Sequence, residues 1–209
     1  MKIRILRKKG GIMEFTIEGV TPAFANALRR IMISEIPVLA VEWIDFHDNS
    51  SVLFDEVIAH RIGLIPLIFD PKKFNFTEDC VCEGKGCPSC QAVFALNKKG
   101  PCMAYSGDMK SSNRDVKPVD SKFPIVELLE NQSIKLEAIS RLGLGTDHAK
   151  FQASNAAYKY QPESPTKNPN KFLFRVEMIS GLKPDYIISK AVEILGERAE
   201  EFKKELNKL

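Results

Sequence analysis

The feature that most constrains the fold of this 209-residue chain is a group of four cysteines within eleven residues. The segment reads CVCEGKGCPSC, or C-x-C-x4-C-x2-C, with the thiols at Cys80, Cys82, Cys87 and Cys90. Four thiolates at this spacing can surround one tetrahedral ion, and the glycines between the two pairs let the chain curl tightly. Residues 80–90 are therefore predicted to form a closed metal loop that leaves no coordination position for water.

The metal of this loop is predicted to be one structural zinc ion. Four cysteines can also hold an iron–sulfur cluster. The spacing is tighter than a ferredoxin run, however, and a short loop suits a single ion better than a cluster. An unmetallated or oxidised loop is the remaining alternative, because some thermophilic cytosols tolerate disulfides.

The composition is that of an ordinary globular protein, with 44% hydrophobic and 27% charged residues, which excludes disordered and collagen-like classes. A net charge of +3 is well short of the concentrated basic patch expected of a protein that binds nucleic acid by itself, and leaves room only for weak contact with DNA or RNA. The sequence has no apolar run of signal-peptide or membrane-span length. A cytoplasmic protein without membrane contact is expected.

Residues 21–34, within TPAFANALRRIMISEIP, are predicted to form a helix. Thr21 suits the N-cap, Pro22 the first helical position, and Pro37 closes the segment. Its apolar stripe contains Phe24, Ala27, Leu28 and Ile31. Arg29 and Arg30 lie side by side on the remaining face.

A second helix is predicted within residues 185–209, where apolar residues follow steps of four and three. This heptad seam contains Ile188, Val192, Leu195, Ala199, Phe202, Leu206 and Leu209. The seam could pack on the chain's own sheet. Because the helix at 21–34 also has a wide apolar face, we favour a surface shared with a second, similar chain.

Between these helices, alternation of apolar and polar residues predicts a hairpin near the start and further strands at 38–44, 92–96, 134–142 and 172–178. A short amphipathic helix is expected at 55–67. Residues 106–124 and the proline-rich segment 161–170 are predicted to be loops.

Four ordered segments resemble the family of archaeal RNA polymerase D subunits. They are FANALRRIMISEIPVLAVEWI (24–44), DEVIAHRIGLIPL (55–67), the cysteine loop, and DHAKFQ (147–152). That family is similar to the third-largest subunit of eukaryotic RNA polymerase II and, more distantly, to the amino-terminal domain of the bacterial alpha subunit. The likeness covers nearly the whole chain.

The resemblance implies an α+β fold. A discontinuous dimerisation domain, a sheet with two packed helices, would comprise residues 1–45 and 148–209. A second, mostly β domain would be inserted at 46–147 and carry the metal loop. The eukaryotic relatives hold zinc at the matching loop, and the cysteine-bearing ferredoxin-like insert of many archaeal members has no counterpart after DHAKFQ.

The resemblance also implies a non-catalytic assembly subunit of DNA-directed RNA polymerase, a nucleotidyltransferase complex active in transcription. It would form a heterodimer with subunit L and offer a platform to subunits N and P and the large subunits, meeting DNA only through the assembled enzyme. The expected dimer interface contains Phe24, Ala27, Leu28, Ile31, Ile188, Val192, Leu195, Ala199 and Phe202. Contacts with the other subunits are expected from Arg29, Arg30, His148 and Lys150, the alternative for the arginines being a solvated basic pair.

Two other classes of function fit the sequence less well. A free-standing zinc module that binds nucleic acid would need basic residues around the cysteines, yet Glu78, Asp79 and Glu83 outnumber Lys85 there. An independent metal-dependent enzyme would need a histidine or carboxylate ligand and an open position on the metal. The three histidines are solitary in the sequence, so no catalytic residue is predicted.

Overall fold

The computed structural model describes residues 1–161 and 170–208. The chain divides into two compact units. The terminal unit contains Met1–Ile36 and Leu144–Leu209, and the middle unit contains Pro37–Gly143. Both combine antiparallel sheets with a few helices, which confirms the predicted α+β class.

The bounds of the two units differ from the predicted limits at 45 and 148 because of one long strand pair. Strand β3 (Val38–Asn49) pairs with β10 (Ser133–Gly143) from Val38 opposite Gly143 to Asn49 opposite Ile134. The ladder holds both strands in the middle unit along their whole length. A role in dimerisation for the terminal unit stays a prediction.

The terminal unit is built on a four-stranded antiparallel sheet in the order β1-β2-β12-β11. Its strands are β1 (Lys2–Lys9), β2 (Ile12–Glu18), β11 (Ser154–Tyr160) and β12 (Lys171–Met178). The predicted hairpin is present, and Gly10 and Gly11 form its turn with φ of 61° and 77°, a conformation that glycine adopts without a steric penalty. At the centre of the sheet, Phe15 of β2 stacks on Phe174 of β12 with ring centroids 5.2 Å apart.

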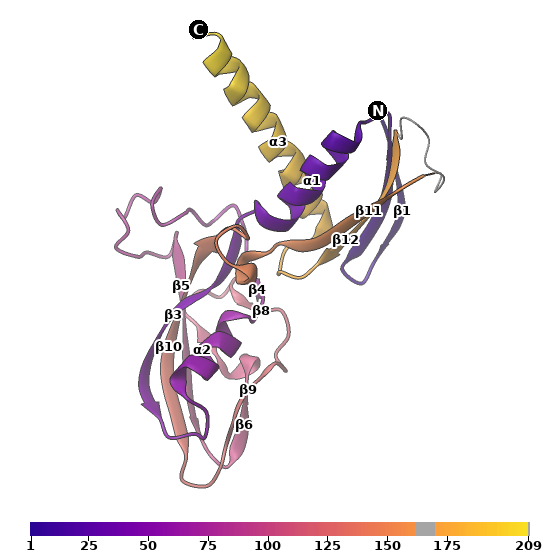
Figure 1. The fold of residues 1–209 in the computed structure, drawn as a ribbon. Coiled ribbons are helices and arrows are strands. Elements are labelled where there is room, and N and C mark those ends of the chain that lie inside the picture. The colour runs from indigo at the N-terminus through magenta and orange to yellow at the C-terminus, as the bar shows by residue number, and fades with distance from the viewer. Residues whose placement is uncertain (162–169, 209) are drawn as a thin grey trace. The chain divides into compact units, whose positions relative to one another are not determined.

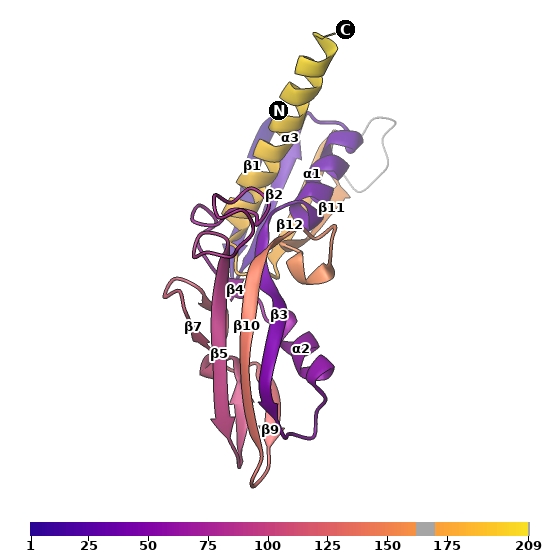
Figure 2. The same ribbon diagram turned by 90° about the vertical axis from the view of Figure 1, so that its left-hand side faces the viewer.

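Helices α1 (Pro22–Ser34) and α3 (Pro184–Leu206) lie on one face of this sheet (Figure 1). The predicted cap of α1 is confirmed, because Thr21 Oγ1 accepts a hydrogen bond of 3.2 Å from the Phe24 amide. Helix α3 buries Ile187 and Ala191 near its start. Its later turns extend past the sheet (Figures 1 and 2).

The middle unit contains a second four-stranded sheet in the order β3-β10-β5-β7, with β5 at Gln91–Lys99 and β7 at Lys110–Ser111. Two small sheets pair β4 (Leu67–Ile68) with β8 (Lys117–Pro118) and β6 (Cys102–Tyr105) with β9 (Pro124–Leu128). Helix α2 (Asp55–Gly63) packs against β3 and β9 and buries Ile58 and Ile62. Short 3-10 helices occur at Ser106–Asp108 in this unit and at Ala149–Phe151 in the terminal unit.

The segment 106–124 is more ordered than the loop that its polar sequence predicted. It contributes β7 and β8, and Ser106 is fully buried. The Ser106 hydroxyl donates a hydrogen bond of 2.6 Å to the Asp120 carbonyl and accepts one of 3.2 Å from the Phe123 amide. A polar residue can be buried here because the local backbone replaces water as its partner.

Two predicted features lie wholly or largely outside the described residues. These are the loop at 161–170, of which 162–169 are not described, and Leu209 at the end of the heptad seam. None of the described helices combines the length and the apolar character needed to cross a membrane.

Candidate metal centre and partner surface

The four cysteines of the metal loop meet at one point. Their Sγ atoms all lie within 4.8 Å of one another. The shortest separations are 3.5 Å between Cys80 and Cys87 and 3.6 Å between Cys82 and Cys90. A tetrahedral ion with metal–sulfur bonds of about 2.3 Å holds its four sulfurs about 3.8 Å apart, so the four thiols are close enough together to share one ion.

The backbone of the loop explains how so short a segment closes on itself. Glu83, Gly84 and Gly86 have positive φ of 52°, 78° and 82°. Three tight turns accompany them, formed by the amides of Glu83, Lys85 and Cys90 and the carbonyls of Cys80, Cys82 and Cys87 at 2.9 to 3.1 Å. The Cys87 amide also donates to Cys90 Sγ at 3.2 Å, a contact that stabilises a thiolate.

The pKa values of the thiols show that the four cysteines of the metal loop do not all ionise easily side by side. Burial would raise the pKa of Cys82, but hydrogen bonds from Cys80, Cys90 and the Gly86 amide outweigh it and lower that pKa to about 7. Burial raises the pKa of Cys90 to about 12. Protons are therefore shared unequally among the thiols, and a soft divalent cation would let all four ionise. The donor set thus fits a metal ion.

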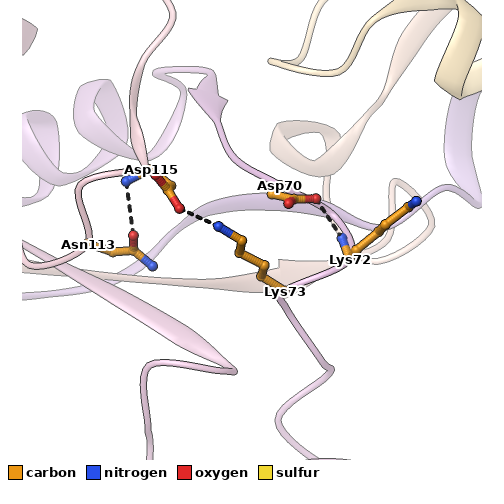
Figure 3. A network of polar contacts seen from close by, with 5 residues as sticks. All are labelled: Asp70, Lys72, Lys73, Asn113 and Asp115. Atoms are coloured by element: carbon orange, nitrogen blue, oxygen red, sulfur yellow. Dashed lines mark hydrogen bonds and ion pairs between the residues drawn. The ribbon is translucent and has the colours of Figure 1, made fainter.

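Residues on both sides anchor the metal loop. The Asn75 amide donates to the Ser89 carbonyl at 2.8 Å. Just before this point, Lys73 Nζ lies 2.5 Å from Asp115 Oδ2 and ties the loop entrance to the turn at 113–116, as Figure 3 shows. Asn113 Oδ1 in turn accepts the Asp115 amide at 3.0 Å.

Arg141 is a further supporting residue, and sequence reasoning missed it. Its guanidinium lies 3.1 Å from a carboxylate oxygen of Glu42, 3.9 Å from one of Glu78, and 5.3 Å from the centre of the Trp43 ring. It thereby joins strands β3 and β10 to the segment that enters the metal loop. The partners lie far from Arg141 in sequence, so no local motif signals the cluster.

The predicted dimer-interface residues divide into three groups in the structure. Leu28 and Ile31 are buried within the terminal unit, at 1% and 2% exposure. The half-buried group contains Phe24, Ala27, Ile188 and Leu195, and the exposed group contains Val192, Ala199 and Phe202. The seam of α3 is thus only partly covered within the terminal unit, whereas Ile187 and Ala191 of the same helix are buried there.

An apolar hollow of about 280 Å³ lies in the terminal unit between β1, α1 and α3. Its apolar lining includes Ile3, Ile5, Phe24, Leu28, Ile188 and Val192. Ile3 and Ile5 were not predicted as surface contacts, although their alternation with Lys2 and Arg4 marked one face of a strand. The hollow joins the half-buried residues of α1 to those of α3.

The four predicted assembly contacts lie in the terminal unit. The guanidinium of Arg29 donates to Asn26 Oδ1 at 3.0 and 3.3 Å, whereas Arg30 is exposed. His148 is exposed, and its Nδ1 accepts the Lys150 amide at 3.1 Å. The Ala153 amide donates to the Ile33 carbonyl at 3.2 Å, which brings the segment after His148 to the end of α1.

Comparison with known proteins identifies the family of this chain. Residues 44–160 match the model of the RNA polymerase Rpb3/RpoA insert domain. This chain belongs to the Rpb3/RpoA insert-domain family. The part of this chain that matches the family model includes the metal loop, Arg141 and His148.

Curated relatives of this chain are named as subunits of DNA-directed RNA polymerase. The chain is 44% identical over 163 residues to the DNA-directed RNA polymerase subunit Rpo3 of Archaeoglobus fulgidus, covering 78% of this chain and 62% of the relative. The subunits Rpo3 of Methanothermobacter thermautotrophicus and Thermoplasma volcanium are 43% and 44% identical, with 62% and 65% of their lengths covered. The chain therefore spans a little under two thirds of the length of these relatives.

Proposed function

We propose that this chain is a non-catalytic assembly subunit of DNA-directed RNA polymerase. It pairs through α1 and α3 with a smaller partner, subunit L in archaea, and the pair is the platform on which the large subunits assemble. The observation that carries the proposal is the uncovered apolar seam of α3. Family membership supports the polymerase as the complex in question.

The seam has the character of an interface that lacks its partner. Val192, Phe202 and Leu206 are 51%, 67% and 51% exposed. They lie along one side of α3, whose later turns extend past the sheet. Burying such side chains contributes roughly 25 cal/mol per Å² of apolar area. Obligate interfaces bury about 2,000 Å² or more in total. The seam and the hollow adjoin each other and would form part of the apolar surface of such an interface.

The partner proposed here is a chain that presents matching apolar helices. Arg29, Arg30, His148 and Lys150 lie in the same unit as the seam, and we assign them to contacts with subunits N and P and the large subunits. DNA is then met only through the assembled enzyme. Cytoplasmic localisation stays a prediction.

For the metal centre, we propose one structural zinc ion held by Cys80, Cys82, Cys87 and Cys90. Zinc supplies a covalent-like cross-link between the two halves of the loop, and four protein ligands leave no site for water or substrate. The ion would therefore fix the shape of the loop and take no part in nucleotidyl transfer.

Co-expression with subunit L tests the proposed function. The chain alone is expected to aggregate or self-associate, because its apolar seam is poorly tolerated in water. With subunit L, light scattering after size exclusion should give a soluble one-to-one heterodimer. A stable monomer that ignores subunit L would overturn the proposal.

A further inference from the structure

Strand β1 is an open edge of the terminal sheet. In the part of the chain that the structure describes, it pairs on one side only, with β2. All eight of its residues are exposed. Alternate residues of an edge strand direct their N–H and C=O groups outward, where another strand can pair with them.

The strand is strongly basic. Five of its eight residues are Lys or Arg and none is acidic. Lys8 forms an ion pair with Asp185 of α3, with Nζ 2.7 Å from the carboxylate. Side chains alternate between the faces, and a bulge at Leu6 shifts the register between Ile5 and Arg7. Lys2, Arg4, Arg7 and Lys9 therefore lie on the sheet face opposite the helices.

The neighbouring strands neutralise this charge only in part. On β2, Glu18 lies opposite Lys2 and Glu14 opposite Arg7. The same two glutamates also lie opposite Lys171 and Arg175 of β12. Two carboxylates of β2 thus face four cations, of which Arg175 also has Glu177 of β12 at 3.7 Å. Arg4 lies opposite an uncharged threonine.

The other face of β1 carries two isoleucines beside the ion-paired Lys8. Ile3 and Ile5 are 61% and 59% exposed and border the hollow beneath α1 and α3. A strand added beside β1 would therefore meet cations on one face and isoleucines on the other. Beside Lys2, Ile3, Arg4 and Ile5, before the bulge at Leu6, its own side chains must alternate in the same way to match both faces.

We propose that β1 is a docking edge for an extended segment of another protein in which acidic and apolar residues alternate. Main-chain hydrogen bonds to the edge would supply affinity, and the alternating side chains would supply specificity. A second copy of β1 does not fit, because pairing of two such strands would oppose cations with cations. The charges that protect this edge from self-association thus select an acidic partner. The proposal stands independently of pairing with subunit L.

A labelled peptide of alternating glutamate and valine tests the edge. The protein is titrated into it at low ionic strength while fluorescence anisotropy is measured, as the co-purified pair with subunit L, or as the chain alone if that is a soluble monomer. Saturable binding is expected. The double variant Lys2→Glu/Arg4→Glu should weaken it by about tenfold, since several exposed ion pairs become repulsive together. Arg4→Lys should retain binding. Hydrogen exchange should show new protection of β1 amides only with the peptide present.

Three matched probes decide the outcome. A peptide with lysine in place of glutamate should bind at least about tenfold more weakly, and a glutamate–valine peptide N-methylated at alternate residues should not bind. If the N-methylated peptide binds equally well, main-chain hydrogen bonds are not needed and charge alone accounts for binding. That result would overturn strand addition. Equal binding of the lysine peptide, absence of any binding, or dimers that protect β1 without peptide would each overturn the proposal as well.

Discussion

Ala191 and Phe202 lie eleven residues, or three turns, apart on nearly the same side of α3, yet Ala191 is fully buried and Phe202 is 67% exposed. The helix therefore keeps its apolar side after the sheet beneath it has ended. Side chains on its last turns have no cover among the described residues of this chain. This relationship makes Phe202 the most informative position for testing the partner surface.

Phe202→Asp is expected to abolish the heterodimer with subunit L. Removing a large central side chain from an interface costs about 2 to 4 kcal/mol, and a buried, unpaired carboxylate adds to that loss. Co-purification and size exclusion would measure it. Glu200→Ala, an exposed change on the same helix, is the matched control and should leave the pair intact. Tight pairing by Phe202→Asp would rule out the proposed role of the seam.

Cys87→Ser is expected to remove the metal. Elemental analysis should find one zinc per wild-type chain and none in the variant, whereas Cys102→Ser, which changes the one cysteine outside the cluster, should keep its zinc. Structural zinc in small fingers contributes about 10 to 16 kcal/mol of binding free energy, but here two four-stranded sheets support the rest of the fold. We expect local disorder of residues 80–90 and a modest fall in Tm. Iron in place of zinc would contradict the assigned metal.

Asp108→Asn is expected to destabilise the middle unit at neutral pH and to do so less in acid. Burial by itself would raise the pKa of Asp108, but Lys98 Nζ at 2.8 Å and the Tyr105 amide at 2.9 Å outweigh it and lower the pKa. The carboxylate therefore stabilises the fold above its unfolded pKa, near 3.9, and this contribution is lost as pH falls through the lower folded value. Denaturation at several pH values should show a difference of about 1 kcal/mol or less that shrinks below about pH 4.

The same measurement in a Lys98→Met background provides the control. Without the cation, the effect of Asp108→Asn at neutral pH should fall, because the pair no longer exists to be broken. An unchanged effect would mean that the Tyr105 amide alone holds the carboxylate.

His148→Ala is expected to leave the pair with subunit L intact and to weaken recruitment of further subunits. The change removes the acceptor for the Lys150 amide and so loosens a segment that is tied to the end of α1. Reconstitution of the complex, read by native mass spectrometry, would detect the loss. His47→Ala, at an exposed histidine of the middle unit, should have no such effect. Loss of the heterodimer itself would place His148 at a different interface.

Features set by local chemistry were predictable from the sequence. The cap and first turn of α1 depend on Thr21 and Pro22, and closure of the metal loop depends on four cysteines and the glycines between them. Each involves residues only a few positions apart, so spacing is enough to specify the contact.

Features set by long-range pairing were not predictable. Leu28 and Val192 belong to similar apolar stripes, yet one is buried and the other half exposed, because the sheet covers only part of each helix. Arg141 is recruited by strands and a loop distant in sequence. Ser106 is buried because the backbone of residues 120–123 supplies its hydrogen-bond partners. No pattern in the sequence near Ser106 indicates this contact.

The order of strands in the terminal sheet also sets an order of events during synthesis. Its two central strands, β2 and β12, are separated by about 150 residues of chain, whereas all strands of the middle unit emerge between them. Domains fold as units while the ribosome is still elongating the chain. The middle unit, with its metal loop, can therefore fold completely before β12 is translated. Until then, β1 and β2 lack the third strand of their sheet. Only a chain translated through α3 can display the exposed apolar residues of that helix, so under the proposed function truncated products would not assemble.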